Sequence, residues 1–240
     1  HLDIDDEKFS ENGAEFFNKD KIIKESDILL QLNLPDEKDL VNLSPSKNLI
    51  GVFDPIKNKV SISKLAKNNI NVFSLELLPR ITRAQSMDIL SSQANLAGYK
   101  AVVDAFSFFN KAIPMMMTAA GTIPAAKVLI VGAGVAGLQA IATAKRMGAI
   151  VFATDVRMAS KEQVESLGGK FLVVEGSENL ETSGGYAKEA SDDFKKKQEN
   201  LLIETLKKID IVICTALIPG KKAPIIIKGD MIKGMPKGSV

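Results

Sequence analysis

A glycine-rich hexapeptide near the middle of the chain has the residue types and spacing of a phosphate-binding turn. Residues 132–137 match G-x-G-x-x-G after an apolar run, and a second apolar run ends at Asp155, 18 residues after Gly137. In this context the first glycine permits a tight turn, the second lets the backbone approach a pyrophosphate, and the third lets a helix pack against the strand. The helix N-terminus then faces the phosphates. We predict a dinucleotide site that comprises Gly132, Ala133, Gly134, Val135, Ala136 and Gly137.

The acidic residue after the second apolar run bears on which dinucleotide binds. A carboxylate there can accept hydrogen bonds from both adenine-ribose hydroxyls, and its charge repels a 2′-phosphate. Arg157 argues against this preference for NAD, because an arginine there can hold that phosphate. We weight Asp155 more heavily because it occupies the fingerprint position. NAD(H) is therefore the predicted cofactor, with Asp155, Val156 and Arg157 beside it; the alternative is that the glycines form only a packing turn.

We predict that parallel strands and helices position this turn. Residues 127–131 form an apolar run too uniform to be half-exposed, as is typical of strands buried on both faces. A helix from the glycine turn to about Met147 follows. We predict further strands at 150–154, 170–174 and 210–215, and helices at 161–167 and 193–206.

The first part of the chain shows the same alternation of predicted strands and helices. Residues 27–32, 48–53 and 70–75 predict strands, residues 62–68 predict a helix, and this alternation favours a parallel sheet. A long helix at 86–109 would join the two parts, with Ser86 as its N-cap and Asp88 in its first turn. Its apolar residues recur three or four apart, at Met87, Leu90, Ala94, Ala97, Ala101, Ala105 and Phe108.

These elements predict an α/β fold of two Rossmann-like domains with parallel sheets, joined by a long helix. We place the first domain at residues 1–91 and the NAD(H)-binding domain at 92–240. The chain opens with His1 rather than methionine and ends on a turn that leads into a strand-like residue. We therefore expect truncation at both ends, an incomplete first domain, and a second domain that lacks its last strands.

Composition excludes some partners. The 240 residues carry 31 basic and 29 acidic side chains and a formal net charge of +2, so no strong field exists to attract nucleic acid. Cys214 is the single cysteine and fits a reducing compartment. Because it lies in an apolar run, we predict a buried, inert thiol. No metal site is predicted.

One apolar stretch needs a test for a membrane span. Between residues 112 and 144 the only charge is Lys127, but Pro114, Gly121 and Pro124 interrupt the first half, and the glycine turn interrupts the second. We predict a strand, a turn and a buried helix there instead.

Residues 176–187 are polar and rich in glycine, and they are longer than a usual strand-to-helix connection. The residues alone leave two interpretations open, a mobile lid and a solvated linker.

Several further motifs carry a resemblance to a known family. Residues 80–99, 114–122, 153–157, 184–189 and 215–220, together with the glycine turn, resemble the NAD(H)-binding component (α subunit, domain I) of proton-translocating NAD(P) transhydrogenase. The resemblance is strong over residues 75–240 and loose before them.

The resemblance implies particular roles. Arg80, Asp88 and Ser91 would hold the dihydronicotinamide and its carboxamide, while Gln85 would reach the partner component. Tyr186 would close over bound nucleotide, which favours the lid. Without the motif, Arg80 and Asp88 would read as an ordinary surface ion pair. In the last of these motifs, the resemblance implies that Thr215, Ala216 and Leu217 lie beside the cofactor.

The implied activity is direct hydride transfer from NADH to NADP⁺ on a partner component. Such transfer needs orientation and little acid–base catalysis, and His1 is the only histidine. The alternatives are an alanine dehydrogenase-like oxidoreductase, a class in which a histidine and a lysine serve the substrate, and a non-catalytic NAD-sensing module.

The family also implies partners. These are an NADP(H)-binding component and a membrane-spanning component that translocates protons, and we expect a homodimer of this chain. The chain would lie peripherally on the cytoplasmic or matrix side of the membrane.

Overall fold

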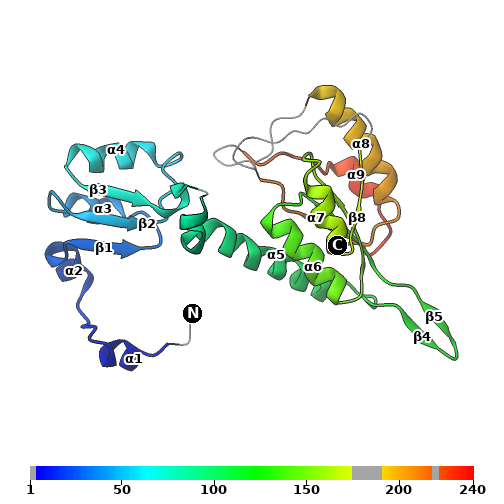
Figure 1. Cartoon of the computed structure of the whole chain (residues 1–240), viewed down its shortest axis with the longest axis horizontal. Coiled ribbons are helices and arrows are strands. Elements are labelled where there is room, and N and C mark those ends of the chain that lie inside the picture. The colour runs from blue at the N-terminus through cyan, green and yellow to red at the C-terminus, as the bar shows by residue number, and fades with distance from the viewer. Residues whose placement is uncertain (1–3, 80, 175–190, 218–221) are drawn as a thin grey trace. The chain divides into compact units, whose positions relative to one another are not determined.

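The computed structural model describes residues 4–79, 81–174, 191–217 and 222–240. The chain divides into two compact units, His1–Asp88 and Ile89–Val240. Figure 1 labels most of their helices and many of their strands. Each unit is described by itself.

The first unit is built on a small parallel sheet. Its strands are ordered β1-β2-β3, and β2 pairs in parallel with both neighbours, so the predicted parallel sheet is confirmed. Its elements are α1 (Asp6–Glu11), α2 (Lys19–Glu25), β1 (Ile28–Gln31), α3 (Glu37–Val41), β2 (Asn48–Gly51), α4 (Lys59–Lys67), β3 (Asn71–Ser74), and the 3₁₀ helices η1 (Leu75–Leu77) and η2 (Thr82–Met87).

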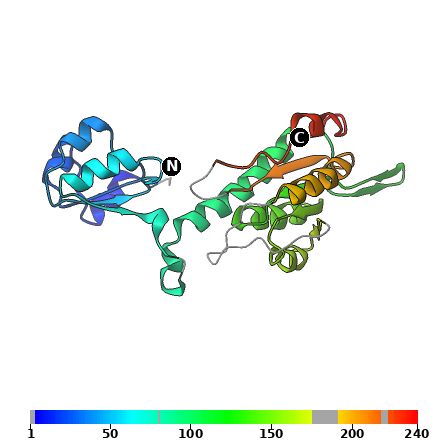
Figure 2. The ribbon, with the colours of Figure 1, turned by 90° about the horizontal axis from the view of Figure 1, so that it is seen from above.

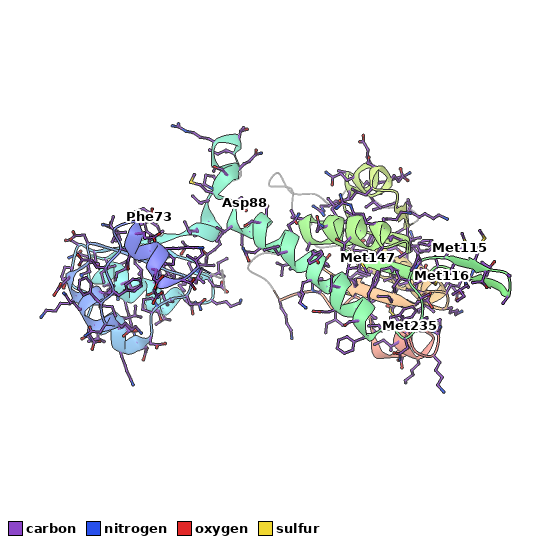
Figure 3. All side chains as sticks on the ribbon, turned by 90° about the horizontal axis from the view of Figure 1, so that it is seen from below. Phe73, Asp88, Met115, Met116, Met147 and Met235 are labelled. Carbon is purple, nitrogen blue, oxygen red and sulfur yellow. The ribbon has the colours of Figure 1, made fainter. Side chains whose placement is uncertain are left out.

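The core of this unit lies on one face of the sheet. Leu49, Phe53 and Leu65 are at most 1% exposed and pack in one cluster. Along β1 the alternation of side chains buries Leu29 and leaves Leu30 75% exposed. The other face of the sheet therefore carries apolar side chains in the open, Phe73 of β3 among them (Figure 3).

The second unit contains a four-stranded parallel sheet in the order β8-β7-β6-β9. The chain leaves β6 toward β7 and β8 and returns on the other side at β9, so the strand order reverses at β6. Its elements are α5 (Ile89–Phe108), β4 (Met116–Thr118), β5 (Gly121–Ile123), β6 (Lys127–Val131), α6 (Val135–Arg146), β7 (Ile150–Thr154), α7 (Ser160–Ser166), β8 (Lys170–Phe171), α8 (Asp192–Leu206), β9 (Ile211–Cys214) and α9 (Gly229–Lys233).

Helices cover both faces of this sheet. On one face Val128 and Ile130 of β6 pack with residues of α5 and α6, such as Val102 and Ile141. On the other face Leu129 and Val131 pack with α8 and α9. Residues 128–131 are at most 1% exposed, so the prediction of a strand buried on both faces is confirmed.

The predicted start of the long helix is wrong. Ser86 lies inside η2, and α5 begins at Ile89. The reason is the backbone of Asp88, whose ψ of 86° is outside the helical region. Asp88 thus directly precedes α5 rather than lying in its first turn (Figure 3).

The buried face of α5 overlaps only in part with the predicted stripe, of which Ala101 and Ala105 pack against the core. Gly98, Val102 and Phe106 are buried, whereas Phe108 is 72% exposed and Leu90 is 41% exposed. The alanine-rich sequence offers several stripes of similar apolarity. Gly98 selects among them, because a Cβ there would stand 2.0 Å from the carbonyl oxygen of Ala136 in α6.

A Gly98→Ala substitution is therefore expected to lower the free energy of unfolding by about 1–3 kcal/mol, the usual cost of overpacking. Thermal unfolding followed by circular dichroism measures it. The sign of the change in the free energy of unfolding is diagnostic, since alanine at an open helical position would stabilise the chain by about 1 kcal/mol. A raised melting temperature would contradict this close contact of α5 and α6.

Residues 112–144 contain a feature that the sequence did not predict. Strands β4 and β5 pair antiparallel with Met116 opposite Ile123, and every residue of both strands is exposed. The hairpin extends away from the rest of its unit in two views (Figures 1 and 2), and Met115 and Met116 mark it in Figure 3. Among the described residues, no helix is both long and apolar enough to cross a membrane.

Cys214 corrects another prediction. It is the last residue of β9 and is exposed, because the strand ends there and buries only Ile211 and Ile213 of its four residues. Partial desolvation still raises the pKa of the thiol above its usual value. Since the thiolate is the reactive form, low reactivity remains the expectation.

Candidate dinucleotide-binding site

The glycine turn joins the carboxyl end of β6 to the N-terminus of α6. Gly132 has a φ of +98°, which an L side chain rarely adopts, and its N–H donates to the carbonyl of Thr154 at the end of β7, 2.8 Å away. Gly134 is the N-cap residue of α6 in an extended conformation. The turn therefore lies at the carboxyl ends of the strands and beside the reversal of strand order, which is where open parallel sheets bind ligands.

The last two glycines of the pattern have different surroundings. A Cβ on Gly137 would stand 1.8 Å from the carbonyl oxygen of Gly132, so this glycine permits close packing of the helix against the turn. Among the described residues, a Cβ on Gly134 would meet only the Nη2 of Arg157, at 3.8 Å. No other described group fills the space beside Gly134, where a phosphate can approach, and the cradle fits a dinucleotide.

The charge distribution of α6 favours an anion at this end. Its first turn contains no acidic residue. The positive end of the helix dipole is thus not offset by a carboxylate from the helix itself.

The other two predicted residues of the turn lie at the start of α6. Val135 is exposed, and Ala136 contacts Gly98 through its backbone.

Asp155 connects the end of β7 to the glycine turn. Its side chain is 6% exposed, and its Oδ2 accepts a hydrogen bond from the backbone N–H of Ala133 at 2.7 Å. Ala133 itself is buried in the core below. Burial raises the pKa of the Asp155 carboxyl, but the hydrogen bonds and charge of Arg157, with the N–H of Ala133, outweigh it and bring the pKa below its usual value. The carboxylate is therefore ionised at neutral pH.

Arg157 forms an ion pair with Asp155, in which Nη2 lies 2.9 Å from Oδ2. Its Nε and its backbone N–H donate to Oδ1, at 2.9 and 2.8 Å. Val156 lies between the two residues and is half-buried. Arg157, which in the sequence is the argument for a bound 2′-phosphate, is thus the direct partner of Asp155.

The residues after β9 support the turn from the other side. The hydroxyl of Thr215 donates to the carbonyl of Gly132 at 2.7 Å, and its N–H donates to the carbonyl of Val131 at 2.9 Å. Ala216 is close enough that a Cβ on Gly132 would stand 2.8 Å from its nitrogen. Leu217 is 68% exposed. Thr215 and Ala216 therefore hold the shape of the turn.

The residues implied for the nicotinamide lie in a different part of the chain. Gln85 is exposed in η2, where buried Ala84 anchors the short helix. Asp88 follows η2, and Ser91 is half-buried in the first turn of α5. Arg80 and Tyr186 lie outside the described residues, and so does the segment 176–187.

The structure brings together one set of predicted residues: the glycine turn, Asp155, Arg157, Thr215 and Ala216. Sequence reasoning missed the role of Gly98, although an isolated glycine in a helical pattern is a signal of close packing. It also missed the hydrogen bond of Thr215 to the turn, for which the sequence offers no signal. Among the described residues, no group of His, Cys, Asp and Glu is placed to hold a metal ion.

A parallel sheet whose order reverses beside a glycine turn, with an acidic residue after the neighbouring strand, is typical of dinucleotide-binding α/β proteins. Comparison with known proteins gives the family. The profile of the "Alanine dehydrogenase/PNT, N-terminal domain" matches residues 1–97, and that of the "Alanine dehydrogenase/PNT, C-terminal domain" matches residues 101–240. The chain therefore belongs to the alanine dehydrogenase/PNT family.

Individual members of the family differ in how similar they are to this chain. An NAD(P) transhydrogenase subunit alpha of Rhodospirillum rubrum is 59% identical over 187 residues, which are 77% of this chain and 49% of that protein. The crystal structure of transhydrogenase from Sinorhizobium meliloti is 45% identical with a TM-score of 0.83, covering 99% of this chain and 64% of that one. Alanine dehydrogenase of Mycolicibacterium smegmatis is 26% identical, covering 99% of this chain and 59% of that protein.

These matches confirm the resemblance to the transhydrogenase α subunit and the predicted α/β fold. The chain spans about half the length of the Rhodospirillum rubrum protein.

Proposed function

We propose that this chain is the NAD(H)-binding component of a proton-translocating NAD(P) transhydrogenase. The observation that carries the proposal is the open face of Gly134 beside an ionised Asp155 that is hydrogen-bonded to the same turn. A helix N-terminus and a carboxylate so placed suit the pyrophosphate and the adenine ribose of one NAD(H). The high identity to a transhydrogenase subunit alpha supports the choice of reaction.

In this proposal the residues of the chain orient the nicotinamide rather than move protons. NADH, when bound, supplies the hydride, which passes directly to NADP⁺ on the partner component. Arg80, Asp88 and Ser91 hold the dihydronicotinamide, Tyr186 closes over the nucleotide, and Gln85 acts across the interface with the partner. Because no proton is exchanged at the reacting carbon, positioning accounts for most of the catalysis.

Because the family also includes alanine dehydrogenases, alanine dehydrogenase activity is the second candidate function. That reaction requires a group that moves the substrate proton, and His1 is the only histidine in the chain. An assay of NAD⁺ reduction by L-alanine, run beside an assay of NADP⁺ reduction by NADH with the partner component present, separates the two. Activity in the alanine assay alone would replace the proposal, and activity in neither would favour the NAD-sensing module.

The partners are also proposals. We infer a membrane-spanning component that translocates protons, so that this chain lies peripherally on the cytoplasmic or matrix side of the membrane. A second copy of the chain is a further proposed partner. The exposed side chains of the β4–β5 hairpin, with Met117 at 75% exposure, support it because they offer apolar surface for association.

We expect the whole polypeptide to bind NADH at least about tenfold more tightly than NADPH, since a buried carboxylate repels a 2′-phosphate and loses a hydroxyl donor. Titration calorimetry with each nucleotide measures the ratio. Equal or tighter binding of NADPH would mean that Arg157, and not Asp155, governs the ribose side of the site.

A further inference from the structure

The carboxylate of Asp155 is already saturated with hydrogen-bond donors. Oδ1 accepts from the backbone N–H and from Nε of Arg157, at 2.8 and 2.9 Å. Oδ2 accepts from the N–H of Ala133 and from Nη2 of Arg157, at 2.7 and 2.9 Å. A carboxylate offers about four lone-pair directions. No direction is left for the two ribose hydroxyls that this residue is proposed to bind, so two donors must leave when the nucleotide enters.

The backbone identifies which donors can leave. The N–H of Ala133 is fixed by the glycine turn, and Arg157 is fixed in its own turn, where its carbonyl accepts from the N–H of Ser160 at 3.1 Å. The guanidinium is at the end of a long side chain that is 16% exposed. Rotation of that side chain frees one lone pair on each carboxylate oxygen without moving the backbone.

A second binding partner for the guanidinium lies close by. Its Nη2 is 3.8 Å from the point where a Cβ on Gly134 would stand, which is the place where the pyrophosphate approaches the turn. Arginine binds phosphate through paired N–H donors, as it binds a carboxylate. The guanidinium thus lies beside both the carboxylate and the place where the pyrophosphate approaches.

We propose that Arg157 is a specificity-determining residue that changes partners during binding. Before the nucleotide binds, it neutralises Asp155. When the nucleotide enters, the ribose hydroxyls take its place on the carboxylate and its guanidinium turns to the pyrophosphate. The exposed charge of Asp155 then rejects a 2′-phosphate, so selectivity develops only in the bound state. The proposal rests on the proposed NAD(H) site.

The test uses two probes that differ only in phosphate, adenosine and ADP, titrated by calorimetry into the whole polypeptide. Arg157→Gln removes both the competition for Asp155 and the contact to phosphate. It is expected to bind adenosine about tenfold more tightly and ADP about tenfold more weakly than the wild type, because a hydrogen bond to a charged group contributes about that much. The preference for ADP over adenosine then falls by about a hundredfold.

Two further variants serve as controls. Arg146→Gln removes the same charge from an exposed position in the last turn of α6 and should leave both affinities unchanged. Arg157→Lys keeps the charge but not the paired donors, so its preference should lie between those of the wild type and Arg157→Gln. Circular dichroism verifies the folded state of each variant.

Equal changes in the affinities for adenosine and ADP would overturn the proposal, because a static Arg157 that only shapes Asp155 affects the ribose in both probes alike. Weaker adenosine binding in Arg157→Gln would overturn it as well. A wild-type protein that bound neither probe nor NADH would instead refute the nucleotide site itself, and this inference with it.

Discussion

A Gly134→Val variant is expected to bind NADH about a hundredfold or more weakly than the wild type, because loss of two hydrogen bonds to a charged phosphate has about that effect. The branched side chain would fill the space through which the pyrophosphate reaches the turn. The fold should persist, since within the described part of the chain a Cβ at Gly134 meets only the Nη2 of Arg157 at 3.8 Å. Calorimetric titration with NADH and thermal unfolding on the same sample give both quantities.

Gly137→Ala is the matched control for this variant. Its added Cβ would stand 1.8 Å from the carbonyl oxygen of Gly132, so the backbone must shift and the melting temperature should fall. The two glycines are three residues apart in one turn, yet Gly134→Val should lose binding with the fold intact, whereas Gly137→Ala should lose stability. Retained NADH affinity in Gly134→Val would reduce the glycine pattern to a packing turn.

Gln85→Asn is expected to slow hydride transfer by up to about a hundredfold, because an error of about 1 Å in the approach of the two reacting carbons can have that effect. Gln85 is exposed in η2, so removal of one methylene should not affect the fold. NADH affinity of the chain should be almost unchanged if the residue acts across the interface. Stopped-flow measurement of transfer, at saturating nucleotide, isolates the rate.

The same substitution at Gln163, an exposed residue of α7, should leave transfer and affinity unaltered. Arg80→Ala should reduce both quantities, since the family role of Arg80 is contact with the dihydronicotinamide. Unchanged transfer in Gln85→Asn would remove Gln85 from the mechanism.

The sequence was sufficient to predict the parts of the fold that are governed by continuous apolar runs. Strand β6 and strand β7 occupy the predicted residues, because a strand covered on both faces leaves a run with few polar residues. The hairpin β4–β5 was missed because all its residues are exposed, and so its apolar residues show neither a burial pattern nor a helical period. The prediction for residues 170–174 was too long, since β8 comprises Lys170 and Phe171, and its pairing with β7 ends where the N–H of Leu172 donates to the carbonyl of Ala153.

The candidate site was predictable to the extent that it depends on backbone spacing. The glycines and Asp155 lie where the pattern requires, because the distance along a strand-turn-helix-strand unit is nearly fixed. The pairing of Arg157 with Asp155 depends on the rotamer of a long side chain, which spacing does not determine. The burial of Cys214 was mispredicted for a related reason, since its exposure depends on where β9 ends and not on the composition around it.

We propose that hydride passes directly from the NADH bound by this chain to NADP⁺ bound by the partner component. The most direct measurement mixes the whole polypeptide with its NADP(H)-binding partner component, NADH deuterated at the transferring position of C4, and NADP⁺ in ordinary water. Mass spectrometry of the products then follows the label. We expect deuterium in the NADPH without dilution by solvent protons. NADPH that formed without the label, or NAD⁺ that accumulated without any NADPH, would contradict direct transfer and with it the proposed function.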